Sequence, residues 1–272
     1  MVAVHAWRSA HAVERFKAKY PERPVVVQLS GTDIYDYIKT DPEPTLRTMA
    51  LADRLVALND LACRVVPKRL RARLCVIHQS ATRFARRPSR RTVVVSVIGH
   101  LRDVKDPLRA AEAARLLPAQ SRVRIEQVGR AYTSEWAERA CAEMATNPRY
   151  IWRDDVSAAA VRRLLSQSHA MVISSRSEGG ANVISEAAVA GVPILASRMD
   201  GNMGLLGQDY PGYFKVGDTE GLARLLQRVE ADPSFVADLG KAVRRRSPLF
   251  RPARETAAWR RLLAGLVSSP AR

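Results

Sequence analysis

The segment Ser177-Glu178-Gly179-Gly180-Ala181-Asn182-Val183-Ile184-Ser185-Glu186 decides the fold, because it joins an apolar run to a helical pattern through two glycines. The run 170–175 before it predicts a buried parallel strand, and the helical pattern 183–190 ends at Gly191-Val192-Pro193. Free backbone N–H groups and the positive end of a helix dipole meet at such a turn, which favours a phosphate. A carboxylate one to two turns into the helix can accept hydrogen bonds from ribose. The turn therefore predicts a site for a sugar nucleotide.

The alternation of strands and helices extends on both sides of this turn. Its strands are nearly continuous apolar runs, which predicts a parallel α/β sheet with helices on both faces. Ligands of such sheets bind beyond the carboxyl ends of the strands, where the 177–186 turn lies. The expected strands are 92–97, 123–128, 150–152, 170–175 and 193–196, and the expected helices are 107–117, 134–145, 157–165 and 183–190.

A shorter set of the same pattern comes first, with strands expected over 2–5, 25–29, 54–58 and 75–78 and helices over 9–19 and 45–51. The charged, aperiodic stretch 83–91 contains one proline and predicts a linker. We therefore predict a partial N-terminal domain over 1–88, a second domain over 89–252 and a final segment over 253–272. That segment holds an amphipathic helix over 254–267, with one side formed by Trp259, Leu262, Leu263 and Leu266.

Composition limits the class of protein. The chain has 272 residues, of which 47% are hydrophobic, enough for two domains. Its net charge of +17 suggests nucleic-acid binding. However, the arginines are scattered and few aromatic residues lie between them. We therefore interpret the arginines as residues on solvated helix faces, where they also attract anionic substrates. We expect no nucleic-acid partner, and the oligomeric state stays open.

Targeting signals and metal-ligand spacings are not recognisable in the sequence. No apolar run approaches the roughly 18 residues that span a membrane, and the first residues do not have the order of a signal peptide. Cys63, Cys75 and Cys141 have neither metal-ligand nor redox spacing, which is typical of reduced cytosolic thiols. We expect a cytoplasmic protein without integral membrane association, metal or cofactor.

Two cations follow the predicted strand 92–97. The loop from Gly99 to Pro107 contains Arg102 and Lys105, which would face the same crevice as the 177–186 turn. Arginine offers a bidentate fork and lysine a point charge, so the pair could neutralise a departing diphosphate. Surface charges on an ordinary loop are the alternative, and it loses weight because the glycine turn ends the adjacent strand.

These motifs together resemble glycosyltransferase family 4. The spacing of Glu178 and Glu186, followed by Gly191-Val192-Pro193, is similar to the E-x7-E signature of that family, and the likeness covers residues 92–267. The resemblance implies a GT-B fold, an α/β architecture of two Rossmann-like domains facing a cleft, with the segment 253–272 crossing back to the first domain. The N-terminal domain is shorter than the resemblance implies, so we expect an incomplete domain and further residues before Met1.

The resemblance also implies a role for each motif residue. Glu178 would contact hydroxyls of the donor sugar, Glu186 would bind the ribose, and Arg102 with Lys105 would act on the leaving phosphates. The remaining expected donor contacts are Gly99, Gly179, Gly180, Ala181, Asn182 and Val183. The donor would be a UDP-sugar, used as a co-substrate by a metal-independent enzyme of the hexosyltransferase type.

A narrower likeness concerns the acceptor. His5-Ala6-Trp7-Arg8-Ser9, the stretch 29–35, Gly99-His100-Leu101-Arg102 and the stretch 209–218 resemble the selenosugar synthases of selenoneine biosynthesis. That resemblance implies selenophosphate as the acceptor. The expected acceptor pocket comprises His5, Arg8, Ser9, Gly31, Thr32 and Asp33, with His5 counted among the catalytic residues and Arg8 as the oxyanion partner.

Several alternatives stay open at this point. His5 is alternatively a structural histidine, and Asp33 a turn or N-cap residue. The acceptor is alternatively a thiol, a sugar or a lipid of another family 4 enzyme. A non-catalytic basic protein that binds nucleic acid or an anionic surface is the alternative of a different class. Two carboxylates at a phosphate-binding turn argue against that class, since they weaken attraction to polyanions.

Overall fold

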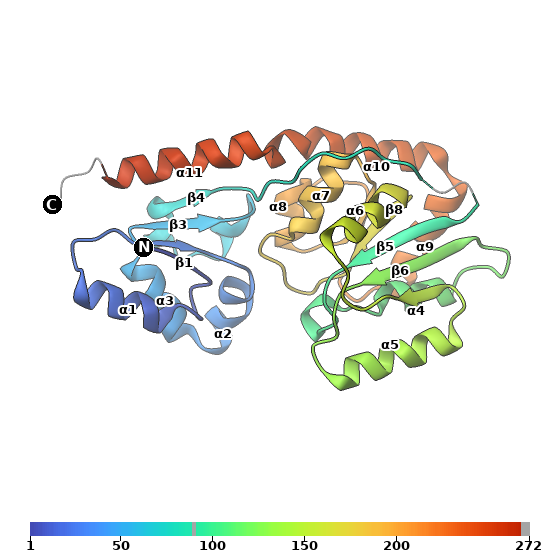
Figure 1. Ribbon diagram of the computed structural model, residues 1–272, viewed down its shortest axis with the longest axis horizontal. Coiled ribbons are helices and arrows are strands. Elements are labelled where there is room, and N and C mark those ends of the chain that lie inside the picture. The colour runs from blue at the N-terminus through green and yellow to red at the C-terminus, as the bar shows by residue number, and fades with distance from the viewer. Residues whose placement is uncertain (89–90, 268–272) are drawn as a thin grey trace.

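The computed structural model describes residues 1–88 and 91–267, which form two parallel β-sheets lying side by side (Figure 1). Residues 89–90 of the predicted linker and 268–272 of the predicted final segment lie outside the described residues. Both sheets are covered by helices that the chain forms between successive strands. The expected α/β class is confirmed.

The first sheet has the order β1-β2-β3-β4 and all its neighbours are parallel. Valine-rich strands suit this sheet because β-branched side chains pack well on a pleated surface. One face packs against α1 and α3 through a core that includes Val13, Val27 and Met49. The elements are β1 (Val2–Val4), α1 (Ala10–Lys19), β2 (Val26–Gln28), α2 (Ile38–Thr40), α3 (Pro42–Leu51), β3 (Arg54–Ala57) and β4 (Leu74–Val76).

The second sheet has the order β10-β9-β8-β5-β6-β7 and is also parallel. Its central strands are buried on both faces, which explains their continuous apolar runs. The strands are β5 (Val93–Ile98), β6 (Val123–Val128), β7 (Tyr150–Trp152), β8 (Ala170–Ile173), β9 (Ile194–Ser197) and β10 (Tyr213–Phe214). The helices are α4 (Arg109–Arg115), α5 (Ser134–Thr146), α6 (Ala158–Gln167), α7 (Asn182–Ala190), α8 (Asp200–Leu206), α9 (Thr219–Ala231) and α10 (Pro233–Arg246).

Helix α11 (Pro252–Val267) lies along the first sheet (Figure 1). It covers the face opposite α1 and α3, where Trp259 and Leu262 pack with Val26, Val56 and Ile77. The prediction of one apolar side was wrong for Leu263, which is 41% exposed. The buried stripe is centred on the side of Ala258 and Leu262, so Leu263 falls at its edge.

The segment after β4 runs beside this helix. The N–H of Ser80 donates to Glu255 at 2.9 Å, and the N–H of Ala81 donates to the carbonyl of Phe250 at 3.1 Å. The chain therefore passes between the two sheets twice, along neighbouring paths. None of the described helices combines the length and the apolar character needed to cross a bilayer.

Candidate functional site

A cavity of about 280 Å³ lies between the two sheets, at the carboxyl ends of their strands. The first sheet contributes the turns after β1 and β2, and the second contributes the loops after β5 and β8. The lining residues are Val4, His5, Arg8, Ser30, Gly31, Thr32, Arg102, Ser177, Glu178 and Gly179. The structure thus brings together residues from the donor and the acceptor motifs of the sequence analysis.

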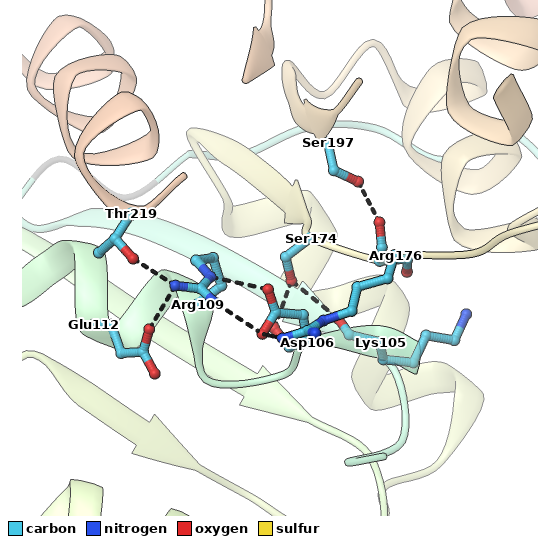
Figure 2. Close-up of polar contacts among 9 residues, drawn as sticks. Lys105, Asp106, Arg109, Glu112, Ser174, Arg176, Ser197 and Thr219 are labelled. Carbon is cyan, nitrogen blue, oxygen red and sulfur yellow. Dashed lines mark hydrogen bonds and ion pairs between the residues drawn. The ribbon is translucent and has the colours of Figure 1, made fainter. Parts of the chain in front are cut away.

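The loop after β5 is fixed against the end of β8. The hydroxyl of Ser174 donates to the carbonyls of Lys105 and Asp106, at 3.1 and 2.9 Å (Figure 2). The N–H of Arg176 donates to the carbonyl of Val104 at 2.8 Å. These three bonds hold the loop that carries Lys105 beside the glycine turn.

A buried carboxylate stabilises the same loop from behind. Asp106 is 8% exposed and accepts bonds from Arg109 Nε and Nη2 at 2.9 and 3.2 Å (Figure 2). Arg109 also donates to Glu112 and Thr219, so the charges of this network are paired. Since a buried unpaired charge is costly, this pairing stabilises the turn.

Of the two predicted catalytic cations, Arg102 lines the 280 Å³ cavity, whereas Lys105 lies behind its lining residue Glu178. Lys105 forms an ion pair with Glu178, which also accepts a bond from Ser175 Oγ at 3.3 Å. The guanidinium carbon of Arg102 lies 5.5 Å from the centroid of the Tyr132 ring, and Arg102 Nε is buried without a hydrogen-bond partner among the described residues. Arg102 therefore retains donor capacity for a ligand.

The remaining predicted donor contacts surround the start of α7. Gly99 and Val183 line a small cavity of about 20 Å³ beside Lys105, and Ala181 is buried. Asn182 donates through Nδ2 to Glu186 Oε1 at 3.3 Å. Burial raises the pKa of Glu186 above 4.5, although the positive charge of Arg162 opposes this shift. Glu186 does not line the 280 Å³ cavity.

The first turn of the acceptor side is organised by His5. Its Nδ1 accepts from the Arg8 N–H at 3.3 Å, so the ring proton lies on Nε2 and donates to Thr32 Oγ1 at 2.9 Å. Desolvation lowers the pKa of His5, the charge of Arg8 acts in the same direction, and that of Asp33 opposes both. The neutral imidazole leaves the hydroxyl proton of Thr32 for another acceptor.

Two predicted acceptor residues lie behind the cavity instead of lining it. Asp33 is fully buried, and its carboxylate accepts backbone N–H bonds from residues 6, 30, 31 and 34. This arrangement agrees with the turn interpretation of Asp33, because the carboxylate ties the two acceptor turns together. Ser9 Oγ donates to the carbonyl of Val4 at 2.7 Å, so it also fixes the first turn.

Glycines allow the two sides of the cleft to touch. A Cβ atom on Gly179 would fall onto the carbonyl of Ser30, and one on Gly180 would overlap Leu58. Gly31, at φ +141°, likewise faces the backbone of Gly179. The glycine pair of the motif thus permits close contact with the loops of the first sheet.

Two residues near the cavity were missed by sequence reasoning. Ser177 lines the cavity at 8% exposure, and its hydroxyl has no hydrogen-bond partner among the described residues. Asn59 is fully buried and donates to the carbonyl of Gly179. A signal existed for Asn59, since a polar residue directly after a buried strand lies at the ligand edge of a parallel sheet. Within residues 1–88 and 91–267, no group of three or more His, Cys, Asp or Glu residues could hold a metal ion.

Comparison with known proteins places this geometry in context. A search of curated proteins found no match. Among solved structures, Anabaena HepE in complex with UDP is 17% identical, with a TM-score of 0.78 over 97% of this chain and 78% of that one. Sucrose-phosphate synthase from Thermosynechococcus elongatus is 18% identical, with a TM-score of 0.78 over 99% and 74%. A glycosyltransferase from Rickettsia africae is 11% identical, with a TM-score of 0.70 over 97% and 82%.

These structural likenesses establish the expected GT-B fold. The sequence itself carries a more specific match, because residues 79–246 fit the family of glycosyl transferases group 1. That range covers more than half of the chain and includes the glycine turn and the Arg102 loop. This protein therefore belongs to the glycosyl transferases group 1 family.

Proposed function

We propose that this protein transfers a sugar from a UDP-sugar to selenophosphate and forms a carbon–selenium bond. The observation that carries the proposal is the shared cavity, which is lined by His5, Arg8 and Thr32 on one side and by Arg102 and Glu178 on the other. A donor and an acceptor must meet in such a place for one displacement to occur. The proposal that the donor contains UDP is supported by HepE, a protein of similar fold whose structure contains UDP.

The proposed binding of the donor is supported by the cationic side chains and the backbone N–H groups around the glycine turn. The departing diphosphate would meet Arg102, Lys105 and the N–H groups at the start of α7, while Glu186 would accept bonds from the ribose. Glu178 would hold the donor sugar by its hydroxyls. Because cations and a helix terminus supply the positive charge, the proposal includes a reaction without metal or cofactor.

The acceptor role rests on cations that face the cavity. Arg8 is exposed and lines the cavity together with Arg102, whereas the charge of Glu178 is compensated by Lys105. This arrangement favours an anionic acceptor, and the likeness of the acceptor motifs to selenosugar synthases narrows it to selenophosphate. The cytoplasmic location and the domain division at residues 88/89 and 252/253 belong to the same proposal.

The proposed reaction balances without a further reactant. A selenium lone pair attacks C1 of the sugar, the bond between C1 and the diphosphate oxygen breaks, and UDP leaves with the bonding electrons. The phosphoryl group stays on selenium in this step. Selenophosphate is a soft anion and needs little help from a general base, so neutral His5 is placed to orient Thr32 rather than to take a proton.

The test is release of UDP from a set of UDP-sugars, with and without selenophosphate. Release that depends on selenophosphate, with a sugar–selenium product identified by mass spectrometry, is the expected result. Release only with a thiol, sugar or lipid would refute the selenium acceptor and retain the transferase. Steeply salt-dependent DNA binding without affinity for UDP would instead favour the non-catalytic binder.

A further inference from the structure

A buried amide of the first sheet reaches the glycine turn of the second. Asn59 follows β3 and is 0% exposed. Its Nδ2 donates to the carbonyl of Gly179 at 2.8 Å, although the two residues are 120 positions apart. The bond is therefore a specific polar link between the two halves, placed directly beneath the cleft.

The orientation of this amide is fixed by its neighbours. Asn59 Oδ1 accepts from the Leu61 N–H at 2.9 Å, which places Nδ2 on the side of Gly179. The second Nδ2 proton points to Tyr35 Oη at 3.3 Å. Gly204 packs so closely against the Asn59 side chain that a Cβ there would overlap it. The amide is therefore held in one orientation, with Nδ2 facing Gly179 and Tyr35.

The geometry of a peptide unit gives this bond a consequence. The carbonyl of Gly179 and the N–H of Gly180 belong to one planar trans unit, so they point in opposite directions. Because Asn59 holds the carbonyl, the Gly180 N–H points away from the Asn59 amide. Glycine on both sides of this peptide allows it a wider range of φ and ψ angles than other residues would, so the bond from Asn59 restricts its orientation.

We propose that Asn59 is a positioning residue, which orients the Gly179–Gly180 peptide for the donor phosphates. The inference rests on the proposed function, because it assigns to Gly180 a contact with the UDP moiety. It adds that donor affinity depends on contact between the two halves. By linkage, UDP binding should then strengthen that contact in return.

Asn59→Asp tests the direction of the bond with an almost unchanged shape. The carboxylate would face the carbonyl of Gly179 and repel it, so UDP affinity should fall about tenfold or more. A buried aspartic acid has a raised pKa, and its protonated form can donate again. The ratio of UDP affinity in Asn59→Asp to that in the unmodified protein should therefore rise from about pH 8 to about pH 5.

Asn59→Ala and Asn147→Asp serve as comparisons. Asn59→Ala should lose UDP affinity without recovery at low pH. Asn147 is another buried asparagine, and it does not line the 280 Å³ cavity. Its Nδ2 donates to the carbonyl of Ala111 at 3.0 Å. Asn147→Asp should change stability while leaving the pH profile of UDP affinity like that of the unmodified protein. UDP affinity of Asn59→Asp equal to the unmodified protein, or a ratio that is flat with pH, would overturn the proposal.

Hydrogen exchange of the ligand-free protein separates this inference from the proposed function. Amide exchange in a peptide covering residues 178–182 should be faster in Asn59→Ala than in the unmodified protein. Amide exchange elsewhere on the second sheet should be unchanged. Unchanged exchange at 178–182 would refute the positioning role even if the natural donor is not UDP. Conversely, faster exchange with no UDP affinity in the unmodified protein would refute the UDP donor and retain the positioning role.

Discussion

The two sides of the cleft are built by different means. On the proposed donor side, several charged side chains are paired with each other, as in the Asp106–Arg109 and Lys105–Glu178 contacts. On the acceptor side, one buried carboxylate, Asp33, holds two backbone turns, while the cation Arg8 stays exposed. The proposed donor side is thus held by ion pairs, whereas the proposed acceptor side presents an exposed cation on a hydrogen-bonded frame.

Gly179→Ala should disturb both sides of the cleft, because the added Cβ on one side would meet the backbone of the other. It would overlap the Ser30 carbonyl and force the two turns apart. We expect activity to fall by roughly a hundredfold or more, as for a clash that costs about 3 kcal/mol. Steady-state kinetics with a circular dichroism control would measure this. Gly265→Ala is the matched control, since a Cβ there meets open space; equal activity of the two variants would contradict the contact.

Glu178→Ala should damage the donor side alone. It removes the partner of Lys105 and the proposed contact with the sugar hydroxyls, so kcat/KM should fall about ten- to a hundredfold, equivalent to about 1.5–3 kcal/mol. The affinity for free UDP should change much less than kcat/KM. Glu220→Ala controls for loss of an acidic residue, because Glu220 is 81% exposed on α9. A UDP affinity that falls in parallel with kcat/KM would show that Glu178 binds the nucleotide instead.

Arg8→Ala should damage the acceptor side alone. The expected effect is about a tenfold rise in the acceptor KM, because one charge–anion contact is lost in a partly solvated cavity. The affinity for UDP should be unchanged in calorimetry. Arg15→Ala on α1 is the control, as Arg15 is an exposed arginine of the same region. Loss of UDP binding in Arg8→Ala would place this cation on the donor side.

The smallest expected effect is the pH dependence of donor binding. In its proposed role, ionised Glu186 accepts stronger hydrogen bonds from ribose than the neutral acid does, and burial raises its pKa above 4.5. UDP affinity should therefore be greatest above this raised pKa and fall several-fold as the pH drops through it. Calorimetric titration across pH would detect the change. Glu186→Gln should bind more weakly with a flat profile, and a retained pH dependence would exclude Glu186 as its cause.

The sequence predicted the second sheet well because its elements have strong local signals. The apolar runs of β5 and β8 and the alternating apolar residues of β6 formed strands, and Ser157 caps α6, accepting from the Ala160 N–H at 3.3 Å. Helices α8, α9 and α10 were missed, although two had readable starts. Asp218 and Asp232 each accept an N–H bond at the start of α9 and α10, at 2.7 and 3.0 Å.

The site was only partly predictable for a different reason. A motif shows which residue types gather at a strand end, and in this way His5, Arg8 and Glu178 were placed in one cavity. It does not show whether a carboxylate turns to the ligand or to the backbone, so Asp33 was assigned to the pocket although it binds N–H groups. Contacts made across 120 positions, such as that of Asn59 with Gly179, have no local pattern.

The packing of α11 on the first sheet affects how the chain is synthesised. Val56 and Ile77 have their cover supplied by Trp259 and Leu262, which the ribosome adds much later. At roughly 5–20 residues per second, that apolar face waits on the order of ten seconds or more. The first half should therefore depend on a chaperone during translation, and a ribosome stalled before α11 should hold a sheet that is open to proteases.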